Sequence, residues 1–252
     1  MGKLIKFEFR KLFKSKYFYI IGAIAIAFVL ISGITTKAIN DAVVANGGEA
    51  TPYSAYLFTK SALSGTFTML IGIFAALFAT EDQTCGTLKN IVAKGYSRTK
   101  LYFSKYIVSL VGVLIISSLT IAVSYGYGNS IWSNSLEITD NVALIVIGQL
   151  LGLLAYHSVF FAISYTSGKV GAAIALNIIG PLGVSLILGM GDAFIKNDNF
   201  KLSSFWLDSL FSNFTSSITD TKLIGVGIAL LIVYFAVAIL VGLLINRRKE
   251  IR

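Results

Sequence analysis

Six long stretches of this chain contain no charged residue, and this feature constrains the fold more than any other. They are residues 17–36, 61–80, 106–136, 141–168, 170–191 and 223–246. A helix needs about 20 mostly apolar residues to cross the hydrocarbon core of a bilayer. A charge near the middle of such a helix costs roughly 2.5–3.5 kcal/mol on insertion scales. Six such gaps therefore predict six membrane-spanning helices.

The composition agrees with this class and excludes others. The chain is 56% hydrophobic and only 13% charged, whereas soluble domains carry about 25% charged residues. A soluble enzyme, a disordered tail and an ordinary nucleic-acid binder are excluded, because the charges could not cover a globular surface. A membrane β-barrel would alternate polar and apolar residues, and these stretches are apolar all round. We expect an all-α membrane protein with one domain, residues 1–252, and spans at about 17–36, 61–80, 106–125, 142–164, 170–190 and 223–245.

The basic residues predict the orientation of the spans. Sixteen of the 21 Lys and Arg residues fall on the side of both termini, and five fall on the other side. By the positive-inside rule both termini and the 81–105 loop are cytoplasmic, and the 191–222 loop is extracellular. The net charge of +9 then reflects topology, so we expect a multi-pass membrane protein with no nucleic-acid partner.

Residues 1–16 have the pattern of an amphipathic helix. At 100° per residue the apolar side chains share one face and the basic side chains share the other, and Phe7 alone breaks the pattern. The apolar face holds Leu4, Ile5, Phe9, Leu12 and Phe13, and the basic face holds Lys3, Lys6, Arg10 and Lys14. Such a segment lies in the headgroup plane of a membrane. A plain basic topology anchor explains the pattern equally well.

Several polar residues lie inside the predicted spans. A buried polar residue in a membrane is a functional candidate, but a hydrogen bond between helices is the more common role. We therefore expect polar helix contacts first, and the lining of a transport path second. The residues are His157, Gln149, Asn177, Ser117 and Thr120. Gly148 and Gly152 form a G-x-x-x-G pattern that indicates close packing, and no His, Cys, Asp or Glu cluster has the spacing of a metal site.

The predicted cytoplasmic loop, residues 81–105, has local structure of its own. Thr80 and Gln83 have the spacing of a capping box, which predicts a short helix that starts at the membrane surface. Glu81 and Asp82 would then lie at the positive N-terminal end of that helix. The pattern fits either a docking helix or a solvated connector.

The residues of this loop resemble those of a known family. Their order is Glu81, then Gly86-Thr87, then a short apolar stretch, then Ser97-Arg98, then Lys105 at the start of a span. This order resembles the cytoplasmic loop of type-2 ABC exporter permeases, and the six-span plan with its N-terminal helix resembles them too. Gly95-Tyr96 departs from the family, which often has a proline there. Small Lys- and Ile-rich permeases of this kind resemble the lantibiotic and bacitracin self-protection subunits.

The resemblance implies a mechanism and partners. Two permease chains, identical or homologous, would dock on two copies of an ABC ATPase that binds ATP and Mg²⁺. The 81–105 loop would be the coupling helix, and Glu81 and Arg98 would tie it to the bundle. Short helices between spans five and six would reach into the outer leaflet. Their aromatic residues Phe205, Trp206 and Phe211 fit an interfacial belt and would form an outer gate or meet lipophilic substrates. The resemblance also implies a protein of the bacterial plasma membrane.

The function expected is export of an amphipathic or peptide-like compound, such as an antimicrobial peptide or drug. The chain itself contains no G-x-x-x-x-G-K-[ST] phosphate loop, so it is no enzyme and holds no cofactor of its own. Two alternatives stay open. An ion-coupled secondary carrier would bury charges near the membrane midplane, and a non-transporting sensor or scaffold would move no substrate.

Overall fold

A computed structural model of the chain describes residues 1–49, 53–132, 142–195, 201–216 and 221–248. Within these ranges the regular elements are all helices. They are α1 (Gly2–Lys14), α2 (Lys16–Ala45), α3 (Ala55–Ser61), α4 (Thr66–Thr84), α5 (Thr87–Ala93), α6 (Arg98–Ile131), α7 (Val142–Ser167), α8 (Val170–Ile195), the 3-10 turn η1 (Leu202–Phe205), α9 (Leu207–Thr215) and α10 (Thr221–Arg248).

Six candidate membrane spans occur among the described residues, which confirms the all-helical membrane class. Five are the single helices α2, α6, α7, α8 and α10, and the sixth combines α3 with α4. Several helices continue beyond the apolar stretches that predicted them. The third begins at Arg98 and ends at Ile131, where the sequence predicted a span over 106–125. The extra turns carry polar residues, which a helix tolerates once it leaves the hydrocarbon core.

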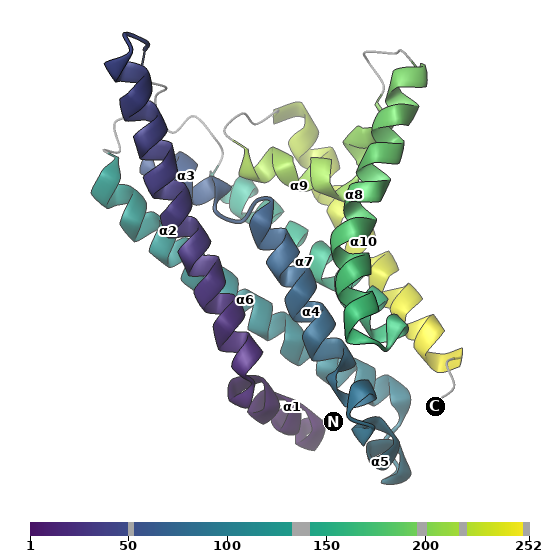
Figure 1. The fold of residues 1–252 in the computed structure, drawn as a ribbon. Helices are drawn as coiled ribbons and strands as arrows, with labels where there is room; N and C mark the ends of the chain where they lie inside the picture. Colours follow the sequence, from purple (N-terminus) through teal and green to yellow (C-terminus); the bar gives the residue numbers. More distant parts are fainter. Residues whose placement is uncertain (50–52, 133–141, 196–200, 217–220, 249–252) are drawn as a thin grey trace.

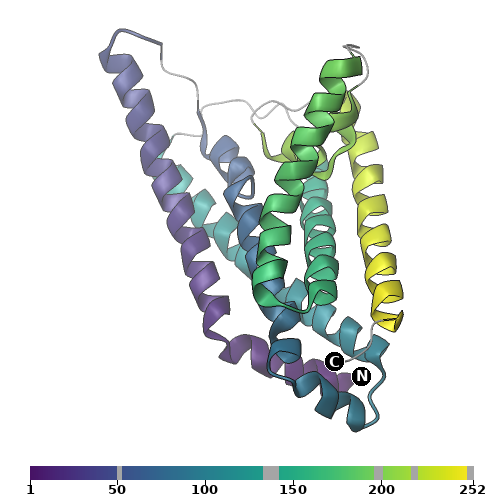
Figure 2. The ribbon, with the colours of Figure 1, turned by 45° about the vertical axis from the view of Figure 1, so that its right-hand side comes forward.

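The spans form a buried centre and an apolar periphery. Helix α7 packs against α4, α8, α9 and α10, and α6 packs against α1, α2 and α3 (Figures 1 and 2). Within the α3–α4 span 61% of the apolar window is buried, compared with 11% in α8 and 11% in α10. The exposed faces of α8 and α10 are nevertheless apolar. In a membrane these faces contact lipid or another chain.

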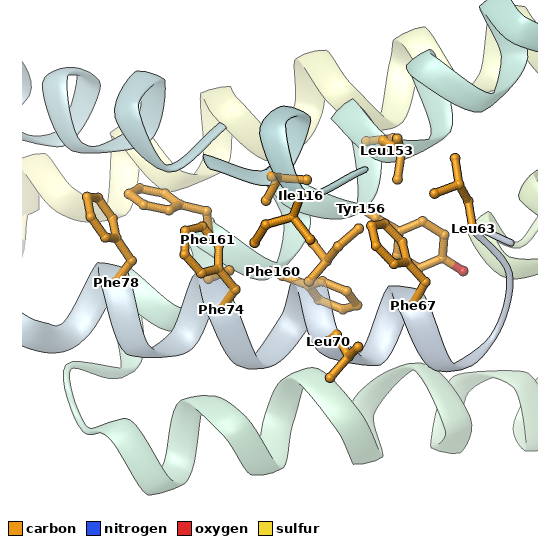
Figure 3. Close-up of a cluster of buried hydrophobic side chains, with 14 of the residues drawn as sticks. Leu63, Phe67, Leu70, Phe74, Phe78, Ile116, Leu153, Tyr156, Phe160 and Phe161 are labelled. Atoms are coloured by element: carbon orange, nitrogen blue, oxygen red, sulfur yellow. The ribbon is translucent and has the colours of Figure 1, made fainter. Parts of the chain in front are cut away.

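Aromatic rings fill the centre between α4 and α7. Phe67, Phe74 and Phe78 project from α4 toward side chains of α7 such as Phe160 and Phe161 (Figure 3). Phe74, Phe78 and Phe161 are fully buried. Large buried rings give dense van der Waals contact, which drives helix association when no water is present.

The two ends of the bundle carry different short elements. Helices α1 and α5 lie at the end where both termini lie, and α3 and α9 lie toward the opposite end (Figures 1 and 2). Ser15 has extended backbone between α1 and α2, and its hydroxyl donates to the Leu12 carbonyl. The chain therefore bends there, and α1 crosses the base of the bundle.

The apolar face of α1 is partly buried against the rest of the protein. Leu4 and Leu12 are buried, and Leu12 lies beside Gly112 of α6. Phe13 belongs to the same apolar face but is 46% exposed. The amphipathic pattern predicted the helix, whereas its main apolar contact is with α6 rather than with lipid alone.

Candidate functional site: a buried charge cluster beside the 81–105 loop

Helix α4 continues through the residues where the sequence predicted a new helix to start. Thr80 is buried inside α4, and its hydroxyl donates to the Ala76 carbonyl at 2.7 Å. The side-chain amide of Gln83 donates to the Tyr165 carbonyl of α7 at 2.9 Å. The predicted capping box is therefore wrong, because both side chains bond within or across the bundle instead. Glu81 and Asp82 lie at the C-terminal end of α4 rather than at the N-terminus of a new helix.

The short helix of this loop is α5, and glycines set its limits. Gly86 and Gly95 have φ values of 68° and 84°, which only glycine adopts without strain. The first lets the chain leave α4, and the second lets it turn from α5 toward α6. The hydroxyl of Ser97 then accepts a hydrogen bond from the Lys100 amide and caps α6. These turns fix where α5 lies relative to α4 and α6.

Asp82 joins four helices at this end of the bundle. Its carboxylate pairs with Lys11 of α1, and its second oxygen lies 2.5 Å from the ammonium nitrogen of Lys105 of α6. The hydroxyl of Thr87, the first residue of α5, donates to the same carboxylate at 3.1 Å. Lys105 is completely buried, and a buried charge costs several kcal/mol unless it is paired. The two cations also offset the unfavourable position of an acid at a helix C-terminus.

Glu81 extends the cluster toward the start of α2. Its carboxylate lies 3.2 Å from the ammonium nitrogen of Lys11 and accepts a hydrogen bond from the Tyr17 hydroxyl at 2.9 Å. Glu81 is partly exposed, so this pair contributes less than the buried one. The two neighbouring acids of α4 thus hold α1, α2, α5 and α6 together.

Glu8 of α1 is buried on the inner side of the same cluster. Both of its carboxylate oxygens lack a hydrogen-bond partner among the described residues. Burial raises the pKa of Glu8 to about 6, and the nearby positive charges of Lys105 and Lys11 only partly oppose this rise. Burial lowers the pKa of Lys11, but the carboxylates of Asp82, Glu81 and Glu8 together outweigh this effect and the net shift is upward.

The structure brings some of the predicted loop residues together and separates others. Glu81, Thr87 and Lys105 belong to one cluster through Lys11 and Asp82. Within the described residues Glu81 and Arg98 form no pair with each other. Arg98 is half-buried at the start of α6, and its carbonyl accepts a hydrogen bond from Asn246 of α10 at 3.4 Å.

Three members of the cluster, Glu8, Lys11 and Asp82, were not among the predicted site residues. Lys11 and Asp82, for example, are 71 residues apart in the sequence, so no local pattern joins them. One signal was present: Glu81 and Asp82 are neighbouring acids on a side of the protein where basic residues are in large excess. Such acids need cations close by.

The residues predicted for helix contacts or a transport path are all buried in the single chain. The amide of Asn177 donates to the carbonyl of Gly72 and to the hydroxyl of Ser164, both at 2.8 Å. His157 lies 2.9 Å from the hydroxyl of Ser109, through its Nε2 atom. Ser117 and Thr120 donate to carbonyls of their own helix, those of Leu114 and Ile116 respectively.

Gln149 and the two glycines beside it hold α9 against α7. The amide of Gln149 donates to the carbonyls of Lys60 and Phe214, each at 2.9 Å. A methyl group at Gly148 would overlap the ring of Phe214. At Gly152 it would overlap the ring of Phe211. The G-x-x-x-G pattern indicated close packing, and the structure shows that aromatic rings of the short helix α9 pack against these two glycines.

The three predicted gate residues lie in different environments. Phe205 is 44% exposed, whereas Phe211 is buried against α7. Trp206 is half-buried and packs edge to face on Tyr234 of α10. Parts of the 191–222 loop, residues 196–200 and 217–220, lie outside the described residues.

The described residues contain no group of three His, Cys, Asp or Glu side chains placed to hold a metal ion. The site is thus a set of ion pairs and hydrogen bonds between helices. These contacts join α1, α2, α4, α5 and α6 at one end of the bundle. Six apolar spans define a multi-pass membrane protein.

Comparison with known proteins identifies the family. The chain matches the ABC-2 family transporter protein family over residues 4–191, about three-quarters of its length. The chain therefore belongs to this family, whose members are membrane subunits of ABC transporters, work with an ABC ATPase and typically have no ATP-binding site of their own. The match extends from α1 to α8 and includes the whole charge cluster. Searches of curated proteins and of solved structures gave no match.

Proposed function

We propose that the chain is the permease subunit of an ATP-driven exporter and that α5 is its coupling helix. An ATPase bound against α5 would pull or push this helix when it closes on ATP and Mg²⁺. The observation that carries the proposal is the position of Asp82, which contacts α5 through Thr87 and two other helices through Lys11 and Lys105. A displacement of α5 would therefore reach α1, α4 and α6 directly.

The roles of the loop residues differ within this proposal. Gly86 and Ser97 set the shape of the loop, and Arg98 supports the start of α6. Lys105 is fully buried, so it acts by positioning Asp82 and makes no contact with the ATPase. Glu81 would tie the loop to α1 and α2 through Lys11 and Tyr17.

The substrate class and direction of transport rest on the resemblance of the loop and of the Lys- and Ile-rich sequence to lantibiotic and bacitracin self-protection permeases. We propose export of an amphipathic or peptide-like compound, and hence a contribution to antibiotic resistance. The apolar exposed faces of α8 and α10 support a second permease chain, identical or homologous, on the membrane side. Two copies of the ATPase would then serve the pair.

The topology proposed here places α1, α5 and both termini in the cytoplasm. The excess of basic residues on that side supports it. In this orientation Phe205 and Trp206 lie near the outer surface and would meet substrate or lipid there. His157, Asn177 and Gln149 are buried, so they would line a path only in a state where α7 separates from α4 and α8.

The test is copurification with the ATPase and resistance to the exported compound, measured for three variants at matched expression. Thr87→Val removes the hydroxyl that joins α5 to Asp82, and Glu81→Gln removes the charge that pairs with Lys11. Arg98→Ala removes a planar cation that Lys could not replace geometrically. We expect each variant to insert normally and to lose most of the resistance.

Lys37→Ala is the control, because Lys37 is exposed on α2 at the other end of the span. It should keep full resistance and normal copurification. If Thr87→Val, Glu81→Gln and Arg98→Ala all retain full resistance, α5 is only a connector. Absence of any copurifying ATPase would instead favour a sensor or scaffold, and transport that persists without ATP would favour an ion-coupled carrier.

A further inference from the structure

A groove of about 440 Å³ lies between α1 and the junction of α4 with α5. Its α1 side includes Phe7, Arg10 and Lys14, and its other side includes Cys85 and Thr87. The volume falls within the usual range of ligand sites, about 300–1,000 Å³. Cys85 is exposed, so the groove is open to molecules from outside the bundle.

The groove carries two cations that have no acidic partner. The acids in its wall, Glu81 and Asp82, are already paired with Lys11, and Asp82 is paired with Lys105 as well. Arg10 and Lys14 are exposed and form no ion pair within the described part of the chain. They are four residues apart on one helix, so their side chains lie on the same face one turn apart. The groove therefore favours an anion between them.

The same groove contains an apolar side chain at its rim. Phe7 is 52% exposed, and it is the residue that interrupts the basic face of α1. A free inorganic anion would make no use of this ring. A phospholipid would use both features, because its phosphate meets the cations while the start of its acyl chains meets the ring.

The position of α1 favours a lipid over an acidic protein segment. Helix α1 crosses the base of the bundle, next to the ends of the spans (Figure 2). Leu4 and Leu12 on its opposite face are buried in the protein. The groove therefore lies at the level of the lipid headgroups, where amphipathic helices with basic residues attract anionic lipid.

We propose that the groove binds the phosphate headgroup of an anionic phospholipid, with Arg10 and Lys14 as its cation pair and Phe7 against its acyl chains. The bound lipid would connect α1 to the first residues of the 85–87 turn. It would thus hold the start of α5 in place. This proposal goes beyond the proposed transport function and does not depend on it.

The test uses Cys85, the single cysteine of the chain, as a reporter in the groove wall. The purified full chain is held in a neutral detergent, and the rate of Cys85 alkylation by a maleimide is measured as phosphatidylglycerol is added. We expect phosphatidylglycerol to slow alkylation, and phosphatidylcholine and inorganic phosphate to leave it unchanged. Thermal melting of each variant checks that it is folded.

The matched variants remove two charges from α1 at different places. Each basic residue near an anionic lipid surface strengthens binding about fivefold, so Arg10→Gln with Lys14→Gln should need about 30-fold more phosphatidylglycerol for the same protection. Lys3→Gln with Lys6→Gln removes the same charge from outside the groove and should behave like the natural chain. Phe7→Ser alone should also weaken protection. The single variant Arg10→Gln, with about a fivefold effect, serves if the double variant does not fold.

Three outcomes would overturn the proposal. Equal protection by phosphatidylcholine would mean that the groove selects no charge, and equal protection by inorganic phosphate would mean that it binds a free anion. Protection by phosphatidylglycerol that is lost equally in both double variants would mean that total charge alone decides binding. If only an added ATPase subunit protects Cys85, the groove is a protein docking surface instead.

Discussion

Asp82→Asn is the substitution that tests the charge cluster most directly. Asn has nearly the shape of Asp and can still accept the hydrogen bond from Thr87, so the change removes mainly the negative charge. Lys105 is then left fully buried without its partner, and Lys11 keeps only Glu81. Both cations remain close to each other in a place with little water.

The expected cost follows from burial and from what remains nearby. Breaking a buried ion pair by removal of one partner costs about 3–5 kcal/mol. The carboxylate of Glu8 also attracts the ammonium group of Lys105. It compensates part of the lost attraction, so we expect a cost at the lower end of this range, about 3 kcal/mol. For a chain of this size 1 kcal/mol corresponds to about 2–4 °C in the melting temperature. The melting temperature should fall by about 6–12 °C.

The assay is thermal melting of the purified chain in detergent at pH 7.5. Asp41→Asn is the matched control, because it makes the same change at an exposed position of α2, and its melting temperature should stay within about 2 °C of the natural value. The double variant Asp82→Asn with Lys105→Met removes both buried charges. Replacing a whole buried pair by apolar groups is often nearly neutral, so the double variant should be less damaged than the sum of its single changes by about 2 kcal/mol.

Two results would refute this reasoning. If Asp82→Asn has the same melting temperature as Asp41→Asn, the negative charge of Asp82 does not contribute to the stability of the fold. If the two changes add without interaction in the double variant, Asp82 and Lys105 do not act as a pair.

Four further predictions concern other parts of the chain. Gly152→Ala should overlap an aromatic ring of α9 and lower stability by about 1–3 kcal/mol, whereas Gly180→Ala, in open space, should not; equal melting of the two would contradict the packing. The raised pKa of Glu8, about 6 compared with 4.5, means that ionisation opposes folding, so stability should fall by about 2 kcal/mol as the pH rises from about 4.5 through 6, and Glu8→Gln should remove this fall in a pH series of melts. In intact cells an impermeant maleimide should label Phe205→Cys in a chain without its natural cysteine but should not label Cys85, and the reverse pattern would invert the topology. The purified chain alone should hydrolyse no ATP in a phosphate-release assay, and turnover that survives removal of every contaminating ATPase would contradict this.

The sequence by itself determined the class of the protein and much of its helix content. A charge-free run of 20 residues has few stable arrangements in a bilayer, because every backbone polar group must be bonded within the segment. This argument is local to each run and needs no knowledge of its neighbours, so six runs predicted six spans. The amphipathic pattern of residues 1–16 predicted α1 for the same reason, since its period of 3.6 residues is visible in the sequence alone.

The tertiary structure decided which polar residues meet. Thr80 and Gln83 have the spacing of a cap, yet α4 continues past them, because Gln83 reaches a carbonyl of α7 and Asp82 reaches cations of α1 and α6. Contacts between distant segments, rather than the local capping pattern, therefore determine the structure at this point. Lys105, which the loop pattern included, is a fully buried member of the cluster, whereas Ser97 of the same pattern is exposed and Arg98 is half-buried.

The same division holds at the other end of the bundle. The sequence indicated close packing at Gly148 and Gly152, but the rings that fill this space come from α9, more than 50 residues later. Helix formation depends on residues three and four apart, whereas the partners of a buried side chain depend on how the helices are arranged around it. For this reason the sequence alone determined the spans, and only the tertiary structure decided that Asp82 joins α1, α4, α5 and α6.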